Sequence, residues 1–135
     1  MAMSDYLQDA LRTHLFRSGT FTKPTELHVA LHTADPLDDA SGAEVTGGSY
    51  ARVQQDPDDA NWSAGTSTDG ITVNLNPLTF PSPTADWGLV THAAVWDAPT
   101  GGNLIGYGPL ATPRSVLNGD GPPVFSPADV VITFV

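Results

Sequence analysis

The stretch that decides the fold is residues 27–52, LHVALHTADPLDDASGAEVTGGSYAR. Its first six residues place leucine and valine on one face and histidine and alanine on the other, which predicts a half-buried strand. Asp35-Pro36 ends this strand, because a residue before proline is driven out of helical geometry and proline has no backbone N–H. An acidic loop and a Gly47-Gly48 turn lead to a short strand near residues 50–54. The stretch therefore predicts a β-protein with long loops.

Composition supports the same class of protein. The 135 residues include 13 Gly and 12 Pro, only 15% are charged, and there is no cysteine. Many turn formers and few charges favour an all-β domain, and the absence of cysteine excludes disulfides and thiolate metal sites. We expect a single domain over residues 1–135, with a helical N-terminal arm at 1–20 and a β-sandwich at 26–135.

One amphipathic helix is predicted at the N-terminus, over Asp5 to Arg17. Ser4 can cap it, Asp5 suits the positive end of the helix dipole, and Gly19 is a plausible terminator. Apolar residues follow at three- and four-residue spacing and form one stripe. The stripe should cover an open end or face of the sheet, or the equivalent helix of a neighbouring subunit.

Further strands are predicted along the rest of the chain. Residues 71–75 alternate, and a Pro-rich passage near 77–83 follows. Residues 90–96 and 104–107 flank a turn-rich segment and form the clearest hairpin, with residues 90, 92, 94 and 96 expected on one face. Two more strands are expected at 114–117 and 129–135. About seven strands separated by turns predict a mostly β, antiparallel β-sandwich or jelly-roll-like fold.

The net charge of −10 bears on partners. A surface of that sign repels phosphate backbones and anionic lipids, so we expect neither a nucleic-acid nor a membrane partner. The chain contains no apolar run of membrane-spanning length, and its first residues lack the basic start and long apolar stretch of a secretory signal.

No catalytic or metal-binding pattern is evident. His28 and His32 are four strand residues apart, about 13 Å, so the two alone cannot ligate one ion. The acidic groups at 35–39 and 56–59 carry the oxygens that calcium prefers, but they do not fit an EF-hand loop. Solvated loop charge is the preferred interpretation. Gly47-Gly48-Ser49-Tyr50 does not match a nucleophile elbow, so we expect no catalytic, metal or cofactor site.

The remaining candidates are interface residues. Tryptophans are favoured anchors at protein interfaces, although filling the core is the commoner use of such residues. The helix stripe offers a second apolar surface. The candidate interface residues are Leu7, Leu11, Leu15, Trp62, Trp87 and Trp96.

Three blocks together carry a family resemblance: Val29–Pro36, Glu44–Arg52 and Trp87–Leu104. Their order and spacing resemble a family of small structural proteins of tailed bacteriophages, described as tail-fibre-like, minor tail or head-decoration proteins. The opening helix and the closing apolar strand also fit that pattern. The resemblance implies a virion protein, assembled in the bacterial host cytoplasm, with no catalytic residues.

The favoured hypothesis is a non-enzymatic subunit on the virion exterior, of minor-tail or tail-fibre type. It would contact other virion proteins and form a homo-oligomer, such as a trimer. One alternative is a capsid decoration protein that binds the major capsid protein. Another is a host-glycan-binding module in which tryptophans stack on sugar rings, assisted by loop carboxylates or calcium. A hydrolytic enzyme ranks last, because no nucleophile or acid–base pair stands out.

Overall fold

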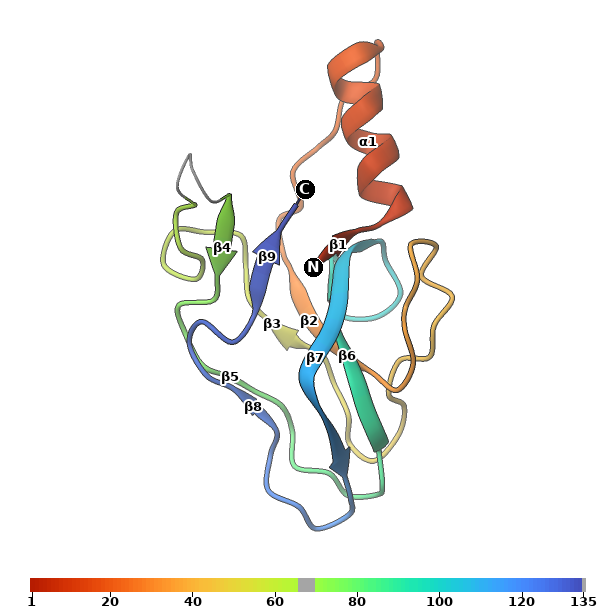
Figure 1. The fold of residues 1–135 in the computed structure, drawn as a ribbon, viewed down its shortest axis with the longest axis vertical. Coiled ribbons are helices and arrows are strands. Elements are labelled where there is room, and N and C mark those ends of the chain that lie inside the picture. The colour runs from red at the N-terminus through yellow and green to blue at the C-terminus, as the bar shows by residue number, and fades with distance from the viewer. Residues whose placement is uncertain (66–69, 135) are drawn as a thin grey trace.

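The computed structural model describes residues 1–65 and 70–134, which form a mostly β fold with one helix, α1 (Asp5–Phe16). Its largest sheet is antiparallel, with the strand order β1-β7-β6-β2-β3 (Figure 1). These strands are β1 (Ala2–Met3), β2 (His28–His32), β3 (Val53–Gln54), β6 (Gly88–Trp96) and β7 (Leu104–Val116). Two small antiparallel sheets pair β4 (Ile71–Val73) with β9 (Val131–Thr133), and β5 (Leu78–Thr79) with β8 (Val124–Phe125).

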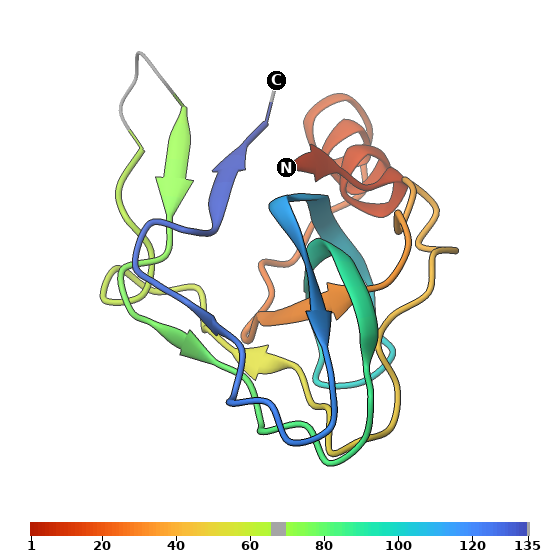
Figure 2. The same ribbon diagram turned by 60° about the horizontal axis from the view of Figure 1, so that its bottom comes forward.

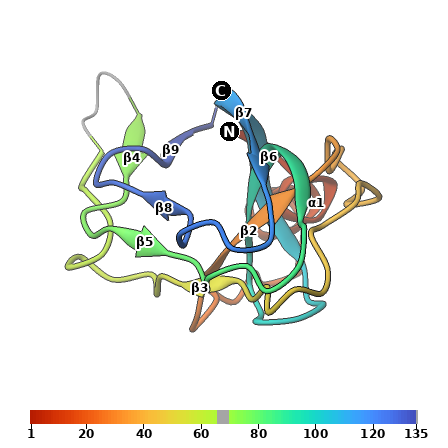
Figure 3. The same cartoon turned by 90° about the horizontal axis from the view of Figure 1, so that it is seen from below.

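The two small sheets face the large sheet across the main core, in a sandwich-like arrangement (Figure 3). Side chains from both layers meet in this core, which confirms the expected fold class. The buried members are Val29, Leu31, Val45, Trp62, Leu78, Phe80, Trp87, Val90, Val95, Val116 and Val130. The C-terminal strand β9 is part of the fold, because it pairs with β4 and the preceding residue, Val130, is buried.

The β6–β7 hairpin confirms the clearest prediction from the sequence. Asp97 holds its turn, since its two carboxylate oxygens accept hydrogen bonds from the backbone N–H (2.6 Å) and the side-chain amide (2.9 Å) of Asn103. Gly101 and Gly102 take positive φ angles of 59° and 75°, which glycine adopts without steric cost. The separate strand expected at 114–117 is wrong, because β7 continues without a break to Val116.

An irregularity in the hairpin changes which side chains of β6 face the core. Val90 pairs with Arg114 and His92 with Pro109, so one residue of β6 lies opposite four residues of β7. Such a bulge shifts the alternation of side chains. Val90 and Val95 therefore both reach the main core, whereas Trp96 lies in a second cluster on the opposite face. The prediction of a single face through residues 90, 92, 94 and 96 is wrong for this reason.

Strand β2 is buried on both faces, so the expectation of a half-buried strand is wrong. Val29 and Leu31 point into the main core, while Ala30 packs in the second cluster with Ala94, Trp96 and Leu104. The loop after β2 contributes Ala40 to this cluster. Both faces are covered because the main core packs on one side of β2 and the second cluster packs on the other.

The N-terminal segment is attached to the large sheet at β7. Ala2 and Met3 form a short strand, missed by the sequence analysis, that pairs with Tyr107 and Gly106. The Ser4 hydroxyl caps α1, as predicted, by accepting a hydrogen bond from the N–H of Leu7 (3.2 Å), and it donates to the Leu104 carbonyl.

The helix projects beyond one end of the sheet, on the side away from the small sheets (Figures 1 and 2). It ends at Phe16, one residue earlier than predicted, because Arg17 turns to extended geometry. Gly19 is not the terminator. Within the described residues, no helix has the length and apolar character to cross a membrane.

Candidate functional site

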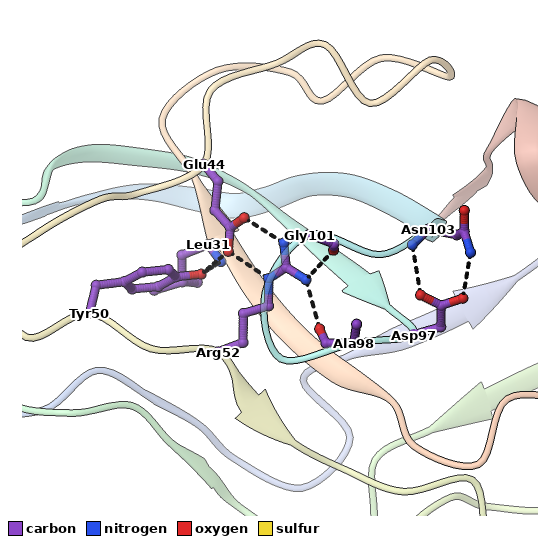
Figure 4. Close-up of polar contacts among 8 residues, drawn as sticks. All are labelled: Leu31, Glu44, Tyr50, Arg52, Asp97, Ala98, Gly101 and Asn103. Atoms are coloured by element: carbon purple, nitrogen blue, oxygen red, sulfur yellow. Dashed lines mark hydrogen bonds and ion pairs between the residues drawn. The ribbon is translucent and has the colours of Figure 1, made fainter.

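A largely buried ion pair between Glu44 and Arg52 lies in the long acidic loop that connects β2 and β3 (Figure 4). The Arg52 guanidinium donates to both carboxylate oxygens of Glu44, from Nε to Oε1 at 2.8 Å and from Nη2 to Oε2 at 2.7 Å. The Arg52 side chain is only 4% exposed and that of Glu44 is 23% exposed. Two parallel hydrogen bonds of this kind fix the relative orientation of the two side chains in addition to pairing their charges.

Arg52 also binds the turn of the β6–β7 hairpin. Its Nη1 donates to the carbonyl oxygens of Ala98 (2.7 Å) and Gly101 (2.9 Å), and its guanidinium carbon lies 4.3 Å from the centre of the Trp96 ring. A cation over an indole face is favourable, more so where water is excluded. One side chain therefore connects the acidic loop, the hairpin turn and the second cluster.

Tyr50 completes this polar cluster. Its hydroxyl accepts a hydrogen bond from the N–H of Leu31 and donates one to Glu44, both at 2.9 Å. Burial, followed by the nearby Glu44 carboxylate, raises the pKa of Tyr50, so the hydroxyl keeps its proton. Burial alone would raise the pKa of Glu44, but the hydrogen bonds from Arg52 and Tyr50 outweigh it and hold that pKa below its usual value. Each of the three side chains therefore has hydrogen-bond partners within the fold.

The other loop carboxylates mostly organise turns. Asp35, Asp39 and Asp58 each accept a hydrogen bond from a backbone N–H two residues further on, at distances of 2.8–3.0 Å. This is the local turn chemistry of aspartate. Asp38 instead accepts a hydrogen bond from the Tyr107 hydroxyl, which raises the pKa of Tyr107 to about 12. Across residues 1–65 and 70–134, no cluster of three or more His, Asp or Glu side chains could hold a metal ion.

The four histidines are dispersed. Nε2 of His28 lies 3.4 Å from Oε2 of Glu26, and Nε2 of His92 lies 3.9 Å from Oδ2 of Asp35. His32 is fully buried and stacks on Trp96, with ring centres 6.1 Å apart, and neither of its ring nitrogens has a hydrogen-bond partner among the described residues. Burial lowers the pKa of His32, so its ring is held neutral.

All three tryptophans are buried, so the structure favours the core-filling alternative for them. Trp62 and Trp87 lie in the main core, where their indole nitrogens donate to the carbonyls of Gln55 (3.1 Å) and Gly48 (2.9 Å). Trp96 lies beneath Arg52. Trp62, Trp87 and Trp96 are 9%, 5% and 8% exposed, and Trp62 also lines a shallow hollow of about 280 Å³ beside Leu27 and Ile132.

The helix stripe divides into a covered and an open part. Leu7 is buried, Leu11 is half-buried, and Leu15 is 67% exposed. Phe16, which the sequence analysis did not select, is 83% exposed. Leu15 and Phe16 are exposed because the C-terminal end of α1 extends past the end of the large sheet (Figure 1). Of the candidate interface residues, Leu11 and Leu15 retain accessible surface, and their use at an interface stays a prediction.

A cleft of about 740 Å³ opens between β7 and the strands β8 and β9. Its walls are largely apolar and include Leu110, Val124 and Val131. Asp35, Arg114 and Asp129 are its charged lining residues. Its lining residues come from both layers of the sandwich, β7 in one and β8 and β9 in the other. The cleft could not be predicted from the sequence, because its walls come from segments far apart in the chain.

The comparison with known families now identifies the class of protein. A family model described as podophage GP4 fiber I protein gp80 matches residues 2–133, nearly the whole chain. No curated protein shows significant similarity to it. The chain therefore belongs to this phage fibre family, and it is a structural protein of the tailed-phage virion.

Proposed function

We propose that this chain is a non-enzymatic subunit of a tail-fibre-type appendage on the exterior of the virion. The observation that carries the proposal is the family match over residues 2–133. In this role the chain binds other virion proteins rather than a substrate, and it acts as one copy in a homo-oligomer such as a trimer.

The polar cluster supports a structural role. Glu44, Tyr50 and Arg52 are hydrogen-bonded to one another, and Tyr50 and Arg52 also bind the backbone of β2 and of the hairpin turn. A catalytic group needs a reactive atom that is accessible to substrate. These three side chains instead fix the loop against the hairpin, which gives the subunit a rigid outer surface.

Purified virions provide the test. Immunogold labelling with antibodies to this chain should mark the tail, and gel densitometry should find far fewer copies of it than of the major capsid protein. The major capsid protein in the same lane serves as the internal standard. Labelling spread over the head, with a copy number close to that of the capsid protein, would contradict the tail placement and favour the decoration alternative.

A further inference from the structure

Two of the open apolar surfaces in the described residues differ in shape and could fit each other. One is the helix tip, which comprises Leu15, Phe16 and Arg17 at the C-terminal end of α1. The other is the cleft between β7 and the β8–β9 side of the sandwich. Exposed apolar surface of this kind is typical of sites that a partner covers.

The helix tip cannot reach the cleft of its own subunit. Strand β1 is paired to β7, and α1 runs away from the sheet from that point (Figure 1). Its last residues, of which Phe16 is 83% exposed, lie at the far end of this projection. The tip is therefore placed to contact another molecule.

The edge of β7 that borders the cleft is unsuited to an added strand. Beyond Tyr107 it has no strand neighbour on that side within the described residues. However, Pro109 and Pro113 remove two N–H donors, and residues 110–113 bulge out of register with β6. Prolines and bulges are features that prevent edge-to-edge pairing. The occupant must then be held by side-chain packing, as an apolar helix end is.

Charge favours a second copy of this chain as that occupant. Residues 12–23 contain Arg12, Arg17 and Lys23 and no acidic residue, whereas the rest of the chain has 15 acidic residues and two basic ones. The basic helix tip and the acidic body of another copy therefore attract each other. At the cleft itself, three exposed charged residues lie beside the apolar walls, and the two acidic ones, Asp35 and Asp129, outnumber the one basic residue, Arg114.

We propose that the helix tip of one subunit docks in the cleft of a second subunit. The proposal rests on the structural role proposed above and names the surfaces through which the subunits assemble. Because the two surfaces differ, the contact is head-to-tail, and it leaves one free tip and one free cleft on every pair. Repetition of such a contact gives a closed ring, or a filament where the rotation does not close.

Cysteine cross-linking tests the contact directly, since the chain has no cysteine of its own. Full-length Phe16→Cys and Val124→Cys proteins are mixed in equal amounts under mild oxidation. The dimers are separated by intact mass, because the two variants differ in mass. Val124 lines the cleft and is 44% exposed. The matched control replaces Val124→Cys with Leu89→Cys, at a residue that is 53% exposed but outside the cleft.

The expected result is a heterodimer of Phe16→Cys with Val124→Cys in clear excess over both homodimers and over the Leu89→Cys control. A prevailing Phe16→Cys homodimer would show tip-to-tip association and overturn the proposal. Equal cross-linking to Val124→Cys and Leu89→Cys would also overturn it, because that is the result of random collision.

Sedimentation velocity gives an independent test without covalent trapping. Phe16→Glu and Val124→Glu should each weaken self-association at least about tenfold, as expected for interface anchors. A mixture of the two should restore a one-to-one dimer, because one intact tip and one intact cleft remain. A wild-type chain that stays monomeric at millimolar concentration would refute the contact. Tail labelling of virions would be unaffected by that failure, so the contact and the tail placement fail separately.

Discussion

The Arg52–Glu44 pair leads to the sharpest prediction about stability. In Arg52→Met, the long unbranched side chain keeps its packing over Trp96 but loses all four hydrogen bonds of the guanidinium. The Glu44 carboxylate, 23% exposed, is then left without its cation. Removing one partner of a buried ion pair costs about 3–5 kcal/mol. We expect the free energy of unfolding to fall by that amount.

Urea denaturation followed by far-UV circular dichroism measures this loss. The matched control is Arg12→Met, which breaks an ion pair with Asp9 whose side chains are 69% and 74% exposed. Exposed pairs contribute about 0.2–1 kcal/mol, so the control should change little. A loss for Arg52→Met within about 1 kcal/mol of the control would refute the argument that burial makes this pair important.

A double-mutant cycle identifies the cause of the loss. Glu44→Gln removes the charge, so Arg52→Met should cost about 1–3 kcal/mol less in that background than in the wild type. The pH dependence has a defined sign as well. The pKa of Glu44 is lowered in the folded state, so the stability from its pairing is present above the usual carboxylate pKa. It is lost as the pH falls through the folded value, and Arg52→Met should weaken that dependence.

Three further predictions concern other parts of the fold. Unfolded histidine binds a proton near pH 6.5, whereas burial keeps His32 neutral beside Glu44, Arg52 and His92. The free energy of unfolding should therefore fall as the pH drops below about 6.5, and His32→Leu should reduce this slope in denaturation series at pH 8 and pH 5, whereas an unchanged slope would contradict the argument. Gly48→Ala should destabilise the fold more than Gly47→Ala in the same assay. Both glycines have positive φ, but only at Gly48 would a Cβ lie 2.9 Å from the Trp87 indole nitrogen. Equal losses of stability in the two variants would contradict this prediction. Ser4→Ala should cost about 1 kcal/mol by removing the cap of α1, seen as a lower thermal midpoint, whereas the exposed Ser18→Ala should leave the midpoint unchanged.

Features that depend on local sequence could be predicted. Ser4 and the stripe beginning at Leu7 define α1 to within one residue, because capping and helical periodicity act within a few residues. The hairpin around Asp97 was also predictable, since turn formers lie between two alternating segments.

Features that depend on packing between distant segments could not be predicted from the sequence. Alternation in 27–32 could not show that a second cluster covers the other face of β2. The bulge opposite Thr91 lies in a segment whose apolar residues still alternate, so the sequence contains no sign that Val90 and Trp96 face opposite sides. The walls of the cleft meet only after the two layers have packed.

The ion pair left one signal in the sequence. Arg52 is the only basic residue between 24 and 113, in a region rich in acidic residues. A solitary cation there points to a specific partner, although eight residues of separation cannot identify Glu44 as that partner. The choice is made by the folded chain, because the Gly47–Gly48 turn lies between the two residues and Arg52 meets Glu44 at 2.7 Å.

The same charge distribution limits how the subunit can meet its partners. Arg52 is almost fully buried and already paired, so its charge is unavailable at the surface. Apart from Arg114, the basic residues that remain all lie between Arg12 and Lys23. An acidic partner surface is therefore attracted chiefly to α1 and the segment after it, while the acidic loops repel it. The basic segment of one copy attracts the acidic surface of another, and the acidic surfaces of the two copies repel each other. These forces orient the approaching copy before any apolar contact forms, as head-to-tail assembly requires.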